Sequence, residues 1–146
     1  MNEKAIERAT EIIGEKTGYI GGGMEGYTVL ALIDENGYPT ASTLTVSKAN
    51  GIEWITFLTG LDSNKAKRIA NCNKGSVCFA SPAYNITLVG TLEILTDLDS
   101  KKEMWQEPIG MMFDGPEDPN FCVIRLRTER YNILLADDGT EATGTL

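Results

Sequence analysis

The sequence predicts a mainly β fold: an antiparallel barrel of six to seven strands with helices at its periphery. Short segments rich in β-branched and aromatic residues follow one another closely. Turn sequences such as Asn36-Gly37 and Asn50-Gly51 separate them. Helical periodicity is confined to short stretches. No repeat or linker divides the 146 residues, so we expect a single domain over residues 1–146.

The chain is expected to begin with a helix over residues 2–16, where apolar residues recur at helical spacing. The glycine run at 21–23 lacks the context of a nucleotide-binding loop, and we interpret it as a connection. The barrel should then occupy about residues 27–136. The polar segment 137–146 is expected to be a frayed tail.

Within the barrel, three strands joined by tight turns form an antiparallel meander. A helix follows, then two strands, a second short helix, a rigid loop and two final strands. In chain order, the expected ranges are 27–33, 39–46, 52–59, 63–71, 76–81, 86–95, 99–105, 114–120, 121–127 and 131–136.

Composition excludes several classes of protein. The net charge of −8 argues against nucleic acid as a partner, because phosphate backbones require a broad positive surface. No apolar stretch is long enough to cross a bilayer, and the charged N-terminus does not resemble a signal peptide. The cysteines form no CxxC pair, and Cys78 and Cys122 are expected to be buried free thiols. We therefore expect a cytoplasmic protein without a membrane partner.

The chain contains no histidine. This excludes Ser-His and Cys-His catalytic pairs, a His-ligated haem and most zinc sites. Glu93, Asp97 and Asp99 are interpreted as a solvated strand end. We assign no catalytic residue and no metal ligand, so any chemistry would come from a bound cofactor.

One stretch of this acidic chain is basic. No acid lies between Asp62 and Glu93, and the segment contains the start of the helix expected at 63–71. Ser63 is a good N-cap, and Lys65 and Arg68 share a face from which Lys67 points away. Free amides, the helix dipole and these cations favour binding of a phosphate or carboxylate. The alternative is an ordinary solvated helix.

Several short segments of the sequence resemble a known protein family. Gly37-x-Pro39, the segment 51–59 and Ser63-x-Lys65 resemble the pyridoxamine 5′-phosphate oxidase-like split-barrel flavoproteins. Met104-Trp105, the stretch from Gly90 to Ile94 and the segment 115–119 resemble the general stress protein 26-type branch. The pieces occur in the right order from about residue 27 to residue 135.

The resemblance implies a split β-barrel that binds FMN at the interface of a homodimer. It implies that the second strand runs beneath the flavin ring and that the start of the helix holds the phosphate. Trp105 would cover the flavin from the partner subunit or, alternatively, fill space in the core or interface. The implied cofactor-binding residues are Ser42, Thr43, Leu44, Thr59, Ser63, Asn64, Lys65, Arg68 and Trp105.

Departures from the family pattern limit the implied function. The oxidase itself has Arg, Lys and Arg where Ser42, Ser47 and Asn64 stand, and Arg68 is a candidate replacement for one of them. It also has an Arg-x-His pair for its substrate, which a chain without histidine cannot supply. We therefore expect an FMN-dependent oxidoreductase that is not a true pyridoxine phosphate oxidase. The alternatives are a non-catalytic flavin-binding stress or sensor protein and an F420-dependent reductase, with FAD as another possible flavin.

Overall fold

The computed structural model describes residues 2–18 and 26–146. The connection expected at 21–23 lies outside the described residues. In chain order the elements are α1 (Glu3–Lys16), β1 (Tyr27–Ile33), β2 (Pro39–Thr45), β3 (Lys48–Asn50), β4 (Trp54–Gly60), α2 (Asn64–Asn71), β5 (Lys74–Ser81), β6 (Tyr84–Leu95), α3 (Leu98–Met104), the 3-10 helix η2 (Glu107–Met111), β7 (Phe121–Leu135) and β8 (Thr140–Thr145).

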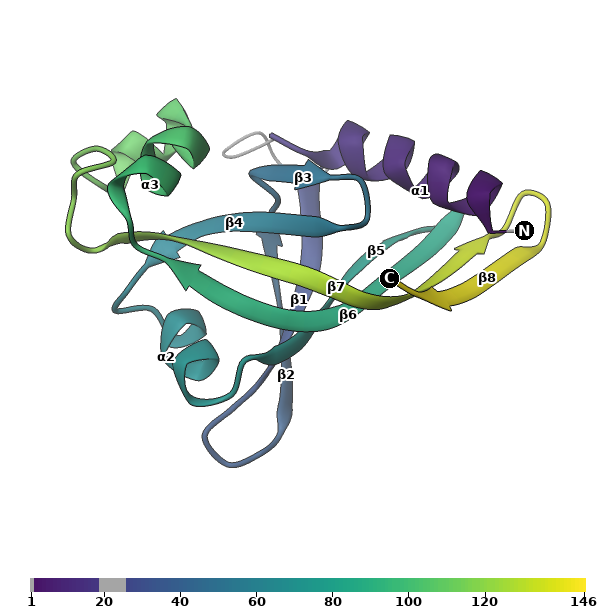
Figure 1. Ribbon diagram of the computed structural model, residues 1–146, viewed down its shortest axis with the longest axis horizontal. Helices are drawn as coiled ribbons and strands as arrows, with labels where there is room; N and C mark the ends of the chain where they lie inside the picture. The colour runs from purple at the N-terminus through teal and green to yellow at the C-terminus, as the bar shows by residue number, and fades with distance from the viewer. Residues whose placement is uncertain (1, 19–25) are drawn as a thin grey trace.

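The strands form one curled antiparallel sheet (Figure 1). Seven strands follow the order β2-β1-β5-β6-β7-β4-β3, and β8 pairs with β7 beside this path. The two ends of the path, β2 and β3, are joined through residues 46–47. This arrangement confirms the predicted mainly β split-barrel fold. None of the helices in the described residues is long and apolar enough to span a membrane.

The concave face of the sheet holds the main core. Side chains alternate along each strand, so every second residue points inward. On β1, for example, Leu30 and Leu32 are buried, whereas Val29 and Ala31 are half-buried. The helix α1 adds Ile12 and Ile13 to the same core. The remaining large buried side chains include Ile55, Phe57, Val77, Phe79, Ile86, Leu88, Ile124, Leu126 and Ile133.

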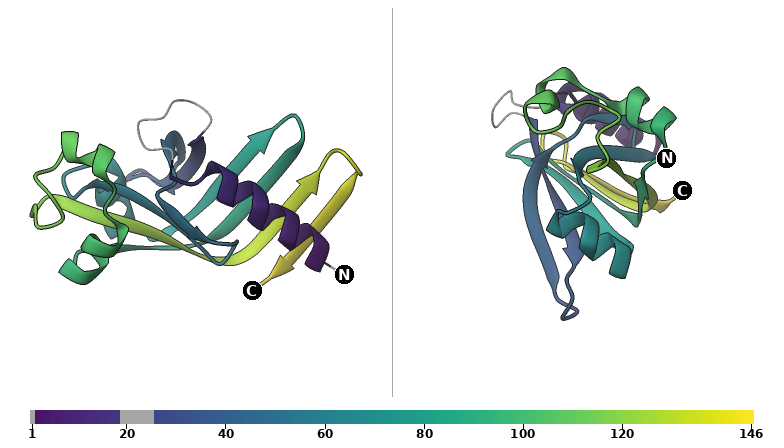
Figure 2. Two further views of the ribbon diagram at one scale, coloured as in Figure 1. Left: turned by 90° about the horizontal axis from the view of Figure 1, so that it is seen from above. Right: turned by 90° about the vertical axis from the view of Figure 1, so that its left-hand side faces the viewer.

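A smaller cluster lies on the opposite face of β4 and β7. It is formed by residues of α3, η2, the segment after η2 and the beginning of β7. Figure 2 shows these helices gathered at one end of the sheet. Its buried members are Met104, Ile109, Phe113, Phe121 and Val123. Phe121 and Val123 point to this cluster, whereas Ile124 and Leu126 point to the main core.

The prediction of two strands at 121–127 and 131–136 is wrong, because β7 runs continuously from Phe121 to Leu135. The polar sequence between them is accommodated by a bulge in the β6–β7 pairing at Val89/Gly90. A side chain at Gly90 would collide with the carbonyl of Arg127. Glycine therefore lets the two strands approach closely enough for β7 to bend without ending.

The prediction of a frayed tail is also wrong. Residues Thr140–Thr145 form β8, which pairs with β7 along its length. Gly139 adopts a φ of 69°, and the Thr140 amide donates to Asp138 Oδ1 at 2.9 Å, which closes the connecting turn. Only Ala142 of β8 is buried, so the strand is polar although it is part of the sheet.

Candidate functional site

The helix α2 begins as the sequence predicts. Ser63 has an extended backbone, and its hydroxyl accepts a hydrogen bond from the Ala66 amide at 3.1 Å. Its own amide donates to the Gly60 carbonyl at 3.1 Å, so a tight turn places the helix directly after β4. The amides of Asn64 and Lys65 lie in the first turn, where a helix offers no internal acceptor. The start of α2 thus presents free donors at the end of β4.

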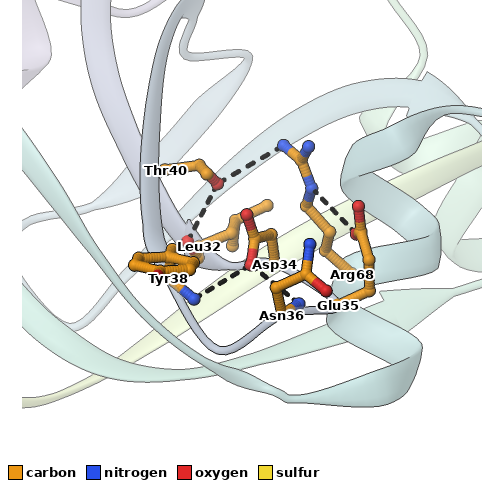
Figure 3. Close-up of polar contacts among 7 residues, drawn as sticks. All are labelled: Leu32, Asp34, Glu35, Asn36, Tyr38, Thr40 and Arg68. Atoms are coloured by element: carbon orange, nitrogen blue, oxygen red, sulfur yellow. Dashed lines mark hydrogen bonds and ion pairs between the residues drawn. The ribbon is translucent and has the colours of Figure 1, made fainter.

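Lys65 and Arg68, the two cations that share a face of α2, have different surroundings. Within the described part of the chain, Lys65 makes no hydrogen bond or ion pair, and it is half-buried. Arg68 instead points at the β1–β2 hairpin, where Nη1 donates to Thr40 Oγ1 at 3.3 Å and Nε lies 3.9 Å from Glu35 Oε2 (Figure 3). The Nε atom of Arg68 is buried without a hydrogen-bond acceptor. Lys65 is therefore the freer charge at the helix start.

None of the seven residues of strand β2 is buried. Ser42 and Thr43 are exposed, and Leu44 is half-buried against the core. The strand lies at the end of the sheet path and pairs only with β1. It is linked to α2 by the Arg68–Thr40 hydrogen bond. The structure therefore brings the predicted ring-binding strand and the predicted phosphate-binding helix together.

Thr59 and Trp105 lie on opposite faces of the sheet. Thr59 is opposite Cys122 in the β4–β7 pairing, on the face that carries the main core. Trp105 packs edge-on against Phe121, with ring centroids 5.0 Å apart and an interplanar angle of 85°. Phe121 and Cys122 are consecutive, so their side chains point to opposite faces. Trp105 therefore does not join Thr59, Ser63 and Lys65 within one chain.

Ser47, where the oxidase has a lysine, lies inside the protein. It is 1% exposed, and its hydroxyl is 2.7 Å from the hydroxyl of Thr56. Its carbonyl accepts a hydrogen bond from Gln106 Nε2 at 2.6 Å, which ties the β2–β3 connection to the segment after α3. Where the oxidase has a lysine, this chain therefore has a buried pair of hydroxyls, those of Ser47 and Thr56. Asn64 and Ser42, at the other two departures, are exposed.

The interpretation of Glu93 as part of a solvated strand end is wrong. Glu93 Oε1 accepts hydrogen bonds from Arg125 Nε at 2.6 Å and from Arg127 Nε at 2.8 Å. Asp97 caps α3 by accepting from the Ser100 amide at 2.9 Å. No sequence signal could show the Glu93 pair, because its partners come from a strand about thirty residues later.

The buried-thiol prediction is correct for one cysteine and wrong for the other. Cys122 is fully buried, and burial raises the pKa of its thiol to about 11. Cys78 is only half-buried, on the convex face of β5. In the loop at 114–120, the Asp118 carboxylate accepts from the amides of Asp114 and Asn120. These backbone hydrogen bonds lower the pKa of Asp118 and agree with the expected rigid loop.

Comparison with known proteins identifies related folds. The family model described as pyridoxamine 5′-phosphate oxidase matches residues 24–134. No curated protein matches the sequence. A Clostridium acetobutylicum protein related to general stress protein 26 is 22% identical, with a TM-score of 0.80 over 100% of this chain and 97% of that chain.

Two further solved structures are of proteins described by the ligand that they bind. A pyridoxamine 5′-phosphate oxidase-related, FMN-binding protein from Nostoc punctiforme is 17% identical, with a TM-score of 0.65 over 99% of this chain and 94% of that chain. A heme-binding protein from Mycobacterium smegmatis is 18% identical, with a TM-score of 0.71 over 97% of this chain and 57% of that chain. At these identities the likeness establishes the fold.

Proposed function

Because this chain belongs to the pyridoxamine 5′-phosphate oxidase family, we propose that it is a flavoprotein that binds FMN at the start of α2 and along β2. The observation that carries the proposal is the free Lys65 at a capped helix start, beside an exposed strand of small side chains. The FMN-binding description of the Nostoc punctiforme protein supports the choice of cofactor.

The donors at the start of α2 fit a phosphate ester. The amides of Asn64 and Lys65, the positive end of the helix dipole and the Lys65 ammonium all favour an anion. Thr59 lies just before the tight turn between β4 and α2, and Ser63 ends this turn. Exposed Ser42 and Asn64 replace two of the family's cations, and buried Ser47 replaces a third. Lys65 therefore supplies most of the positive side-chain charge at the proposed phosphate site.

Strand β2 fits one side of a planar ring. Exposed Ser42 and Thr43 leave the backbone accessible, and their small side chains allow close approach. Leu44 adds an apolar surface at the same strand. Trp105 faces away from this site in its own chain, and we propose that it covers the flavin bound to a second copy.

We further propose that the protein is a homodimer. The convex face of β1, β5 and β6 supports this proposal, because it carries small, half-exposed and mostly apolar or uncharged side chains. They are Val29, Ala31, Ser76, Cys78, Thr87 and Val89. Thr43 lies opposite Val29, so this face continues onto β2 at Thr43, whereas Ser42 and Leu44 lie on the inner face, opposite Leu30 and Thr28. A second copy packed there would cover this face and Thr43.

The proposed activity is that of an FMN-dependent oxidoreductase acting on a small molecule. Bound FMN would supply the hydride or electron transfer, while this chain binds its phosphate and orients its ring. Without histidine the chain lacks the family's Arg-x-His pair, so pyridoxine phosphate is not the proposed substrate. The free thiols of Cys72, Cys78 and Cys122 support a reducing, cytoplasmic location.

The absorption spectrum of the purified full-length protein tests the cofactor. We expect a yellow protein with flavin bands. A haem Soret band would overturn the proposal, and it is the outcome suggested by the Mycobacterium smegmatis relative. Release of the chromophore and its chromatography distinguish FMN from FAD and F420.

Steady-state oxidation of NADH or NADPH by the FMN-loaded protein tests the proposed activity. Turnover supports an oxidoreductase. Stable FMN binding without turnover, with a range of electron acceptors, would instead indicate a flavin-binding stress or sensor protein.

A further inference from the structure

The β1–β2 hairpin is internally rigid. Asp34 Oδ1 accepts hydrogen bonds from the amides of Asn36 and Tyr38, each at 2.9 Å (Figure 3). The Asp34 amide also donates to the Tyr38 carbonyl at 2.8 Å. Gly37 takes the positive φ of 84° that this turn needs. The hairpin tip and the first residues of β2 are therefore expected to move together.

Arg68 joins this hairpin to α2 at two points. Its Nη1 donates to Thr40 Oγ1 at the start of β2, and its Nε lies 3.9 Å from the Glu35 carboxylate at the hairpin tip. Thr40 Oγ1 in turn donates to the Leu32 carbonyl of β1 at 3.0 Å. The contact therefore includes both strands of the hairpin (Figure 3).

Strand β2 needs such a contact. It pairs with β1 alone, and Leu44 is its only side chain packed against the main core, so few direct contacts fix its position relative to α2. Arg68 Nη1 supplies a direct hydrogen bond between α2 and β2, which are the two elements of the proposed FMN site. Thr40, its acceptor, lies only two residues before Ser42.

We infer that Arg68 is a positioning residue: it fixes β2 against α2 and so sets the spacing between the ring end and the phosphate end of the site, instead of binding the phosphate. This inference rests on the proposed function. The guanidinium points toward the hairpin, and the neighbouring Glu35 carboxylate would repel a phosphate that approached it. Within the described residues, the Lys65 ammonium forms no ion pair with a carboxylate.

Binding of FMN and riboflavin to Arg68→Met and Thr40→Val tests the inference. Thr40→Val removes the hydrogen-bond acceptor at nearly constant shape and leaves the Arg68 charge in place. If Arg68 positions β2, both variants weaken FMN and riboflavin alike, by about fivefold, which is the loss expected from one hydrogen bond. Lys67→Met, on the exposed side of the same helix, serves as the control and should bind both flavins like the parent.

A different pattern would overturn the inference. If Arg68→Met loses affinity for FMN but not for riboflavin, while Thr40→Val matches the parent, then Arg68 contacts the phosphate directly. Equal affinities in all variants would likewise exclude a positioning role.

Hydrogen exchange of the flavin-free full-length protein separates this inference from the proposed function. We expect Arg68→Met and Thr40→Val to exchange several-fold faster than the parent and Lys67→Met over residues 34–44. Unchanged exchange would overturn the positioning role even if FMN binds. If the parent binds no flavin but exchange rises in both variants, the contact between Arg68 and β2 stands and the proposed cofactor fails.

Discussion

Glu93 and Arg125 are paired across β6 and β7, and Arg125 Nε donates to Glu93 Oε1 at 2.6 Å. Partial burial raises the pKa of Glu93, but the hydrogen bonds and charges of Arg125 and Arg127 outweigh it and hold the pKa below its ordinary value of 4.5. A carboxylate whose pKa is lower in the folded state stabilises the fold above the unfolded pKa. That contribution disappears as the pH falls through the folded pKa.

We therefore predict that Glu93→Gln lowers the free energy of unfolding by about 1 kcal/mol at pH 7, a value reduced from that of a buried pair because Glu93 is partly exposed. Below the folded pKa the variant and the parent should converge. Urea unfolding at a series of pH values from 7 downward checks this. Glu129→Gln, an exposed glutamate of β7, is the control and should change little. A loss from Glu93→Gln that grows as the pH falls would contradict the assignment.

Cys122 should be the least reactive thiol in the protein. Burial and the raised pKa of about 11 leave little thiolate at pH 8. We predict that a thiol reagent modifies Cys122 on the order of a hundredfold more slowly than the partly exposed Cys72, until the protein is unfolded. Peptide mapping after timed labelling measures both rates in one sample. Comparable rates in the folded protein would show that Cys122 is accessible.

In the proposed homodimer, the convex face of β1, β5 and β6 forms the interface. We predict that Val29→Arg converts the protein from a dimer to a folded monomer near 15.9 kDa, because it would bring like charges and bulk into the interface. Light scattering measures the mass, and circular dichroism checks the fold. Leu98→Arg, at an exposed apolar residue of α3, is the control and should remain dimeric.

Labelling of Cys78 provides a second measure of the same interface. Cys78 lies opposite Val29, so it should be protected in the parent and modified in the Val29→Arg monomer. A parent that is a monomer and still binds FMN would refute the dimer. Rapid Cys78 labelling in a dimeric parent would place the interface on another face.

Local sequence signals predict most of this fold. The helix at 2–16 and the capped helix at 63–71 follow from apolar spacing and from Ser63. The predicted meander is wrong, because β2 pairs only with β1 while β4 pairs with β3 and β7. Two further errors lie where polar residues hide regular structure. Asp138-Gly139 before an alternating segment is a hairpin signal, but β8 buries only Ala142 and so lacks an apolar pattern. The continuity of β7 depends on Gly90, a residue of another strand.

The candidate site also combines features that the sequence predicts with features that depend on the tertiary fold. The cap by Ser63 and the basic first turn with Lys65 could be predicted from sequence, because both are local features. The partners of Arg68 could not, since Glu35 and Thr40 approach it only through the tertiary fold. The alternation of β7 likewise decides that Trp105 and Thr59 lie on opposite faces, which sequence spacing does not reveal.

Titration of FMN and riboflavin fluorescence against the parent, Lys65→Ala and Lys67→Ala tests the central claim most directly. We predict that the parent binds FMN much more tightly than riboflavin. Lys65→Ala should weaken FMN binding about tenfold or more, the worth of a charge-assisted hydrogen bond, and leave riboflavin binding nearly unchanged. Lys67→Ala makes the same change in net charge and should bind FMN like the parent. Equal losses from the two lysine variants, or equal losses for the two flavins, would contradict a phosphate site at the start of α2.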